Sequence, residues 1–201
     1  MIVCVFALVL LVGSTDAAVI AIADPTTQVT ASSEIVGNFD RIDDHIVNGS
    51  GLTGGGHTNA VKSTMWLSTG TSFGGDDLDP FVIFDLGAAY TINSFHVWNY
   101  NELAGATDLA TRGVNSVSVE YGLTGALGST VAGITNFAKA DTTATYAGED
   151  FNTFTPFDAR FIKFDINSNH GGDNNFYGLS EVQFDGVPVP EPATIFVMMA
   201  A

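Results

Sequence analysis

The chain has 201 residues, of which 22 are acidic and six are basic, so its formal net charge at pH 7 is −16. Such a chain repels phosphate backbones, which excludes nucleic acid as an expected partner, and it attracts divalent cations, among which calcium is the one to look for. The only cysteine, Cys4, lies near the N-terminus, which excludes a disulfide scaffold, a thiolate zinc site and cysteine catalysis in the body of the chain.

The chain begins with an apolar run, IVCVFALVLLV, at residues 2–12. Small residues follow, with one cleavage motif at Ala21-Ile22-Ala23 and another candidate at Thr15-Asp16-Ala17. This order is typical of a secretory signal peptide, which we expect as a helix within residues 1–23. The alternative is an uncleaved N-terminal anchor. Both interpretations predict that the rest of the chain is exported.

The body, residues 24–187, is long enough to form one domain with its own core. Apolar and polar residues alternate with period two in several segments separated by connections rich in glycine and asparagine, whereas no segment shows a convincing helical stripe. This pattern predicts an all-β fold, an antiparallel β-sandwich. The expected strands are residues 81–86, 90–98, 114–121, 160–166 and 179–187.

Residues 37–62 and 167–177 are two long stretches without this alternation. Long loops in a compact domain are usually functional or disordered. We therefore look for a binding site in these loops and in the connection that follows residue 98.

Several short motifs follow one another along the body. In chain order they are Val29-Thr30-Ala31-Ser32-Ser33-Glu34, Ile46-Val47-Asn48-Gly49, Thr64-Met65-Trp66, Phe84-Asp85-Leu86-Gly87, Val97-Trp98-Asn99-Tyr100 and Gly178-Leu179-Ser180-Glu181-Val182-Gln183-Phe184. This set resembles the discoidin domain, the coagulation factor V/VIII type C fold, and the related family 32 carbohydrate-binding modules. The resemblance implies a jelly-roll sandwich of the galactose-binding-domain type that binds carbohydrate without catalysis. Trp66 is then a core residue or, alternatively, a surface platform for a sugar.

The resemblance also implies one structural calcium ion, held by an early loop and by the glutamate of the last strand. Carried over to this chain, the ligands are Glu181, Asn48 and backbone oxygen near Ser50. Asn48 stands where the family has aspartate, so Asp43 or Asp44 is expected to supply the missing charge. The alternative is a solvent-exposed Glu181. A second acidic cluster, Asp76, Asp77 and Asp79, lacks the ligand spacing of an EF-hand and is expected to be a solvated turn.

A sugar site needs planar hydrogen-bonding groups and an aromatic face. Side chains of these types lie on connections that are expected to meet at one end of the sandwich. The candidate ligand residues are Asn99, Asn101, Arg112, His170 and Asn175, with Phe176 or Tyr177 as the stacking face. Arg112 is alternatively an ion-pair partner of Glu102.

Signals of catalysis are absent from the sequence. No G-x-S-x-G motif occurs, and no two histidines have zinc-site spacing. We therefore expect a binding module rather than an enzyme. A structural component of an extracellular polysaccharide matrix is the alternative, and a small secreted hydrolase is the weakest interpretation.

The C-terminal segment, residues 188–201, begins PVPEPAT and continues into apolar residues. It resembles the PEP-CTERM sorting signal of exported bacterial proteins. That resemblance implies a membrane anchor, processing by a protease of the exosortase type, and a final place at the cell surface or in the extracellular matrix. Only seven residues follow Thr194, and no basic cluster closes the chain, so either the segment is truncated or the anchor is absent.

Overall fold

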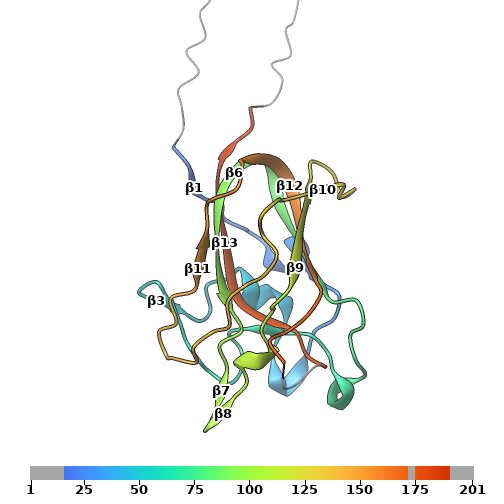
Figure 1. The fold of residues 1–201 in the computed structure, drawn as a ribbon, viewed down its shortest axis with the longest axis vertical. Coiled ribbons are helices and arrows are strands. Elements are labelled where there is room, and N and C mark those ends of the chain that lie inside the picture. Colours follow the sequence, from blue (N-terminus) through green and yellow to red (C-terminus); the bar gives the residue numbers. More distant parts are fainter. Residues whose placement is uncertain (1–15, 172–174, 191–201) are drawn as a thin grey trace, which may run out of the picture.

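Two antiparallel layers share one long strand, β6 (Phe81–Asn99). Its first half pairs with β12 (Phe157–Ile166), from Phe81 opposite Asp165 to Ile92 opposite Phe157. Its second half pairs with β13 (Gly178–Pro188), from Tyr90 opposite Pro188 to Asn99 opposite Leu179. The computed structural model describes residues 16–171 and 175–190, and in this part of the chain the predicted all-β antiparallel sandwich is confirmed (Figure 1).

Shorter elements complete the two layers. Strand β9 extends the layer of β12, whereas β1 lies beside β13. The strands are β1 (Ala18–Val19), β2 (Val29–Ala31), β3 (Leu52–Thr53), β4 (Gly56–His57), β5 (Trp66–Leu67), β7 (Leu103–Ala104), β8 (Thr107–Asp108), β9 (Val117–Gly122), β10 (Ser129–Thr130) and β11 (Glu149–Phe151). The helical turns are α1 (Pro25–Gln28), η1 (Gly37–Phe39), η2 (Asp43–Ile46), η3 (Thr71–Phe73) and η4 (Ala110–Arg112).

Aromatic side chains fill the space between the layers. The ring centroid of Phe84 lies 5.2 Å from that of Phe164 and 5.1 Å from that of Phe184, both in edge-to-face contact. Such pairs add roughly 0.5–1.5 kcal/mol to the effect of burial alone. Trp66 is fully buried and its indole Nε1–H donates to the Ser33 carbonyl over 2.8 Å. Trp66 is therefore a core residue, and it cannot act as a surface platform.

The sequence predicted two strands, residues 81–86 and 90–98, where the structure has β6 alone. Gly87 interrupts the regular backbone with φ +77°, a conformation that favours glycine. The carboxylate of Asp85 accepts a hydrogen bond from the Gly87 N–H and two from the Arg160 guanidinium. The predicted strand 114–121 begins later, at Val117, because Gly113 and Val114 instead form isolated bridges to Gly178 and Asn169.

The folded body extends into residues that the sequence assigned to the signal peptide. Ala18 and Val19 pair with Gly186 and Asp185 of β13, and the Ile20 N–H donates to the Phe184 carbonyl over 2.8 Å. The predicted signal run at residues 2–12 and the apolar tail after residue 190 lie outside the described residues. Of the helices that the structure describes, none has the length and apolar character of a membrane span. Both ends of the described chain lie at the same end of the sandwich (Figure 1).

We expect Ile20→Ala to lower the free energy of unfolding by about 2–5 kcal/mol, because it removes a buried side chain from the main core and leaves a cavity. Denaturant unfolding of the purified chain measures the change. Val19→Ala is the matched control, since the neighbouring Val19 is 58% exposed. Its effect should stay within about 0.5 kcal/mol. Equal stability of Ile20→Ala and the unsubstituted chain would show that this segment is not part of the folded body.

Candidate functional site

The irregular connections gather at the end of the sandwich opposite both termini, where η1, η3, η4 and the β7–β8 hairpin lie (Figure 1). We name this region the loop end. Backbone contacts join its segments: the His170 N–H donates to the Gly113 carbonyl over 3.1 Å, and the Ser68 N–H donates to the Tyr177 carbonyl over 2.8 Å. The connections that carry Arg112, His170 and Asn175 are therefore neighbours in space, as the sequence predicted.

A row of aromatic rings crosses the loop end. The ring centroids of Phe39 and Phe73 are 4.8 Å apart, and those of Phe73 and Phe176 are 6.0 Å apart. The guanidinium carbon of Arg112 lies 4.5 Å from the centroid of Phe176. Exposure falls along this row, from Phe39, which is 46% exposed, to Phe176, which is 5% exposed. The ring that can meet a ligand is thus Phe39, with Phe73 behind it.

The predicted stacking residues have other roles. Phe176 packs with Met65, Leu67 and Tyr100 in a small core beneath the loop end. Tyr177 is half-buried and packs against the main core. The structure therefore places Phe176 too deep to serve as a stacking face, and the exposed ring comes from Phe39, which the sequence interpretation did not include.

The polar candidates nearest the surface are Arg112, His170 and Asn175. Arg112 is half-buried, and the Asn175 Nδ2 donates to the Thr71 hydroxyl over 2.6 Å, which ties the last loop to η3. Burial lowers the pKa of His170, so the imidazole is held neutral, and its Nε2 has no hydrogen-bond partner within the described residues. This Nε2 is itself buried, so His170 does not present it to a ligand at the surface.

Asn99 and Asn101, by contrast, are fully buried. The Asn99 Nδ2 donates to the carbonyls of Val114 and Ala138 over 2.7 and 2.8 Å. The Asn101 Nδ2 donates to the Thr143 carbonyl over 2.8 Å and also reaches the carbonyl of His57. Both amides satisfy backbone groups of surrounding loops, so they hold the loop end together, and we remove them from the candidate ligand site.

Glu102 is paired with Arg41 rather than with Arg112. The Arg41 Nη2 contacts both a Glu102 carboxylate oxygen and the Val61 carbonyl, and the Arg41 Nε donates to the Tyr100 hydroxyl over 3.0 Å. The Tyr100 hydroxyl in turn donates to Glu102. Burial, and then the carboxylate of Glu102, raise the pKa of Tyr100 well above its ordinary value, so the phenol stays protonated.

The expected calcium ligands meet only in part. Glu181 of β13 is 1% exposed, so the solvent-exposed alternative is wrong, and both of its carboxylate oxygens lie 3.1 Å from the Gly49 backbone nitrogen. Gly49 has φ +71°, which lets the turn present this N–H. The side-chain oxygen of Asn48 accepts the Ser50 N–H over 2.9 Å. The Ser50 hydroxyl lies 3.3 Å from the His45 Nδ1.

The two aspartates expected to supply charge have other partners. Asp43 accepts the Ala31 N–H over 2.8 Å, and Asp44 accepts the Thr26 hydroxyl over 3.2 Å. Within the described residues, no cluster of three or more His, Cys, Asp or Glu side chains could hold a metal ion. Calcium needs six to eight oxygen ligands, whereas here a backbone N–H points at the one carboxylate. The donors as arranged do not fit the ion, and calcium binding stays a prediction of the resemblance.

The second acidic cluster organises its own loop. Asp77 accepts the hydroxyls of Ser32 and Ser33, each over 2.5 Å, and Asp76 accepts that of Thr71 over 2.5 Å. These bonds tie the connection before β6 to β2 and η3. Asp76 and Asp79 are exposed and Asp77 is half-buried, which agrees with the predicted solvated turn.

No protein-family model and no curated protein matches this chain. Solved structures do resemble it. The C-terminal domain of a chitobiase from Bacteroides fragilis has a TM-score of 0.56 at 18% identity, covering 83% of this chain and 98% of that one. A family 32 carbohydrate-binding module from Clostridium perfringens, in complex with GalNAc-β-1,3-galactose, has a TM-score of 0.55 at 15% identity, with coverage of 83% and 99%.

The third structure is truncated AlyQ with CBM32 and alginate lyase domains, at a TM-score of 0.54 and 20% identity. The alignment covers 90% of this chain but 36% of that protein, so this chain spans about a third of its length. At these identities the likeness shows the fold: this chain has the β-sandwich fold of family 32 carbohydrate-binding modules.

We expect Arg41→Ala to lower the free energy of unfolding by about 3–5 kcal/mol, because it leaves the buried Glu102 carboxylate without its cation. Replacing both residues with leucine should recover most of the loss, since no buried charge remains. Lys62→Ala is the control, because this lysine makes one exposed hydrogen bond, to the Asn38 carbonyl. Denaturant unfolding tests all three variants, and an Arg41→Ala variant as stable as Lys62→Ala would contradict the role of the buried pair.

Stability should fall as pH rises from about 4.5 to about 8, because of Glu181. Burial raises the pKa of this carboxyl to about 8, from an ordinary value of 4.5 that the unfolded chain keeps. The folded chain therefore binds more protons in this window, and ionisation of the buried acid favours unfolding. Each unit of pKa difference corresponds to about 1.4 kcal/mol, so the full effect is a few kcal/mol.

Glu181→Gln should flatten this pH dependence in melting curves, since the amide does not ionise. Asp43→Asn is the matched control: burial raises the pKa of Asp43 to about 6, so its removal should alter the curve only below about pH 6.5. A melting temperature that added calcium raises, and that Glu181→Gln returns to the metal-free value, would instead support the calcium site.

Proposed function

We propose that this chain is a non-catalytic carbohydrate-binding module whose ligand lies against the loop end. One observation carries the proposal: connections distant in sequence bring polar side chains and an exposed aromatic ring to the same end of the sandwich. The ring is that of Phe39, which is exposed, and the polar groups are those of Arg112 and Asn175.

Sugars present two kinds of surface that such a site recognises. The apolar C–H face of a pyranose packs on an aromatic ring, and the hydroxyls need planar hydrogen-bonding groups. Phe39 offers the ring, held from behind by Phe73 in edge-to-face contact. Arg112 offers N–H donors in a fixed fork, and it is positioned over the Phe176 ring.

The solved structures support this choice. They include carbohydrate-binding modules, one in complex with GalNAc-β-1,3-galactose, and some are attached to catalytic domains. A chain with the same fold and a polar, aromatic loop end is more simply a binding module than a hydrolase. A component of a polysaccharide matrix with no defined ligand pocket is the outcome to expect if no sugar binds.

Export and surface sorting are also part of the proposal, on the pattern of residues 1–23 and 188–201. Most of these two segments lies outside the described residues, and an exosortase-type protease is proposed as the processing partner on the same pattern. The position of the termini is compatible with this arrangement. Attachment through the C-terminus would leave the loop end facing away from the surface that carries the protein (Figure 1).

Screening the chain on a glycan array, followed by calorimetric titration of one positive glycan, tests the ligand site. Phe39→Ala should weaken binding by roughly 0.5–1.5 kcal/mol, because it removes the exposed ring. Arg112→Ala should weaken it by about 1.5–3 kcal/mol, because it removes a charged donor. Neither change should move the melting temperature by more than a few degrees.

Leu78→Ala is the matched control, since Leu78 is 90% exposed, is not aromatic and lies on the loop between η3 and β6. It should bind as the unsubstituted chain does. If both Phe39→Ala and Arg112→Ala bind the glycan as tightly as the unsubstituted chain does, the ligand lies elsewhere. If no glycan binds at millimolar concentration, the matrix-component interpretation replaces the proposal.

A further inference from the structure

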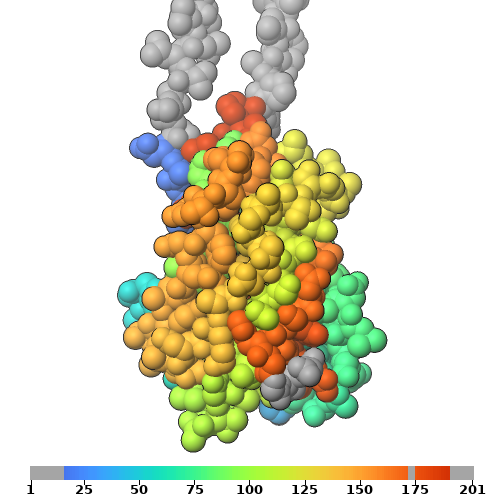
Figure 2. Space-filling model, in the orientation of Figure 1, coloured from blue at the N-terminus to red at the C-terminus, as the bar shows by residue number. Residues whose placement is uncertain are grey.

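A pocket lies at the end of the sandwich opposite the loop end, beside the termini. It has a volume of about 330 Å³, at the lower end of the roughly 300–1,000 Å³ range of ligand pockets. Its walls are the end of β9, the segment that follows β10, and the connection between β11 and β12, which lie side by side in Figure 2. The lining residues are Tyr121, Thr130, Val131, Ala132, Thr153, Phe154, Thr155, Pro156 and Phe157.

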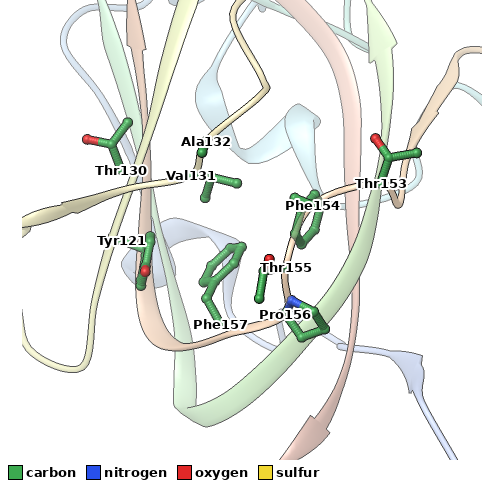
Figure 3. Close-up of a pocket in the computed structure, with 9 residues that line it drawn as sticks. All are labelled: Tyr121, Thr130, Val131, Ala132, Thr153, Phe154, Thr155, Pro156 and Phe157. Atoms are coloured by element: carbon green, nitrogen blue, oxygen red, sulfur yellow. The ribbon is translucent and has the colours of Figure 1, made fainter.

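Three aromatic rings form one side of this pocket. The centroid of Phe157 lies 4.2 Å from that of Tyr121 and 5.5 Å from that of Phe154. Phe157 is buried, and the other two rings are half-buried, so part of each faces the opening. Figure 3 shows Phe154 and Phe157 around a common space with the side chains of Val131 and Thr155.

The polar side chains that line the pocket all carry hydroxyls. They belong to Tyr121, Thr130, Thr153 and Thr155, and none of them has a hydrogen-bond partner among the described residues. The three threonines are exposed, so water can bond their hydroxyls when no ligand is bound. An apolar ligand that displaced this water would not replace its hydrogen bonds, whereas a ligand that carries hydroxyls would.

Charge narrows the ligand class further. No Asp, Glu, Lys or Arg is among the described residues that line the pocket, so it has no cation for an acidic ligand. The chain as a whole carries a net charge of −16, which repels anions at longer range. Aromatic faces together with uncharged hydroxyls match a neutral sugar, whose C–H face packs on rings and whose hydroxyls exchange hydrogen bonds with hydroxyls.

We propose that this pocket is a second carbohydrate site, specific for a neutral sugar of one or two residues. It does not depend on the loop-end site, because no residue is shared between them. The two sites face opposite ends of the sandwich, so one chain can bind two glycan segments at once.

Amide NMR spectra of the full chain, titrated with D-galactose or D-glucose into the millimolar range, test the proposal. We expect shifts at residues 129–132 and 153–157. The double variant Tyr121→Phe with Thr155→Val keeps the shape of the pocket and removes two hydroxyls. It should raise the Kd measured from these shifts by roughly ten- to thirtyfold. Thr145→Val is the matched control, because Thr145 is exposed and does not line the pocket.

Phe39→Ala separates this proposal from the proposed function, since it should weaken loop-end binding and leave the pocket shifts unchanged. D-Galacturonate should bind the pocket more weakly than D-galactose. The proposal is overturned if neither neutral sugar shifts the pocket residues, if the double variant has the Kd of the unsubstituted chain, or if galacturonate binds more tightly.

Discussion

Strand β6 is the constraint on which the rest of the architecture depends, because it belongs to both layers of the sandwich. Its pairing with β12 and with β13 fixes where those two strands end, and therefore where the connections after β6 and before β13 meet. Gly87, with its positive φ, and the Asp85–Arg160 ion pair lie where the strand passes between layers. The position of the loop end thus follows from backbone pairing in the core, far from any ligand.

Within the loop end, the buried pair of Arg41 and Glu102 connects the segment after η1 to the residues that follow β6. Arg41 follows η1, which carries Phe39, whereas Glu102 and Tyr100 come directly after β6. A buried ion pair adds little net stability, because desolvation opposes the attraction, but its partners can be satisfied in few geometries. The pair therefore fixes the position of η1, and with it the exposed ring of Phe39, relative to the end of β6. A preorganised binding surface requires such a fixed position.

Alternation along the strands was sufficient to predict the sandwich. A strand buried on one face alternates apolar and polar residues, and this pattern can be recognised within each segment by itself. The meeting of Glu181 with the turn at Gly49 was also predictable, but only from the family resemblance. The roles of Asn99 and Asn101 were not, since their amides bind carbonyls more than ten residues away, and a loop asparagine has the same local pattern whether buried or exposed. Phe39 lies in a short turn without periodicity, so the sequence does not identify it as a site residue, and only its contact with Phe73 in the structure does.

The two proposed sites bear on the choice between a binding module and a matrix component. A protein with one sugar site binds a single polysaccharide chain, whereas a protein with sites at opposite ends can cross-link two of them. Each weak contact then raises the effective concentration of the other, so millimolar affinities at single sites become compatible with stable retention in a polysaccharide network. The pocket also lies at the end from which the C-terminal segment leaves, while the loop end points the other way (Figure 1). Binding and matrix formation are then two consequences of one arrangement. The loop-end site faces outward, and the pocket faces the point of attachment.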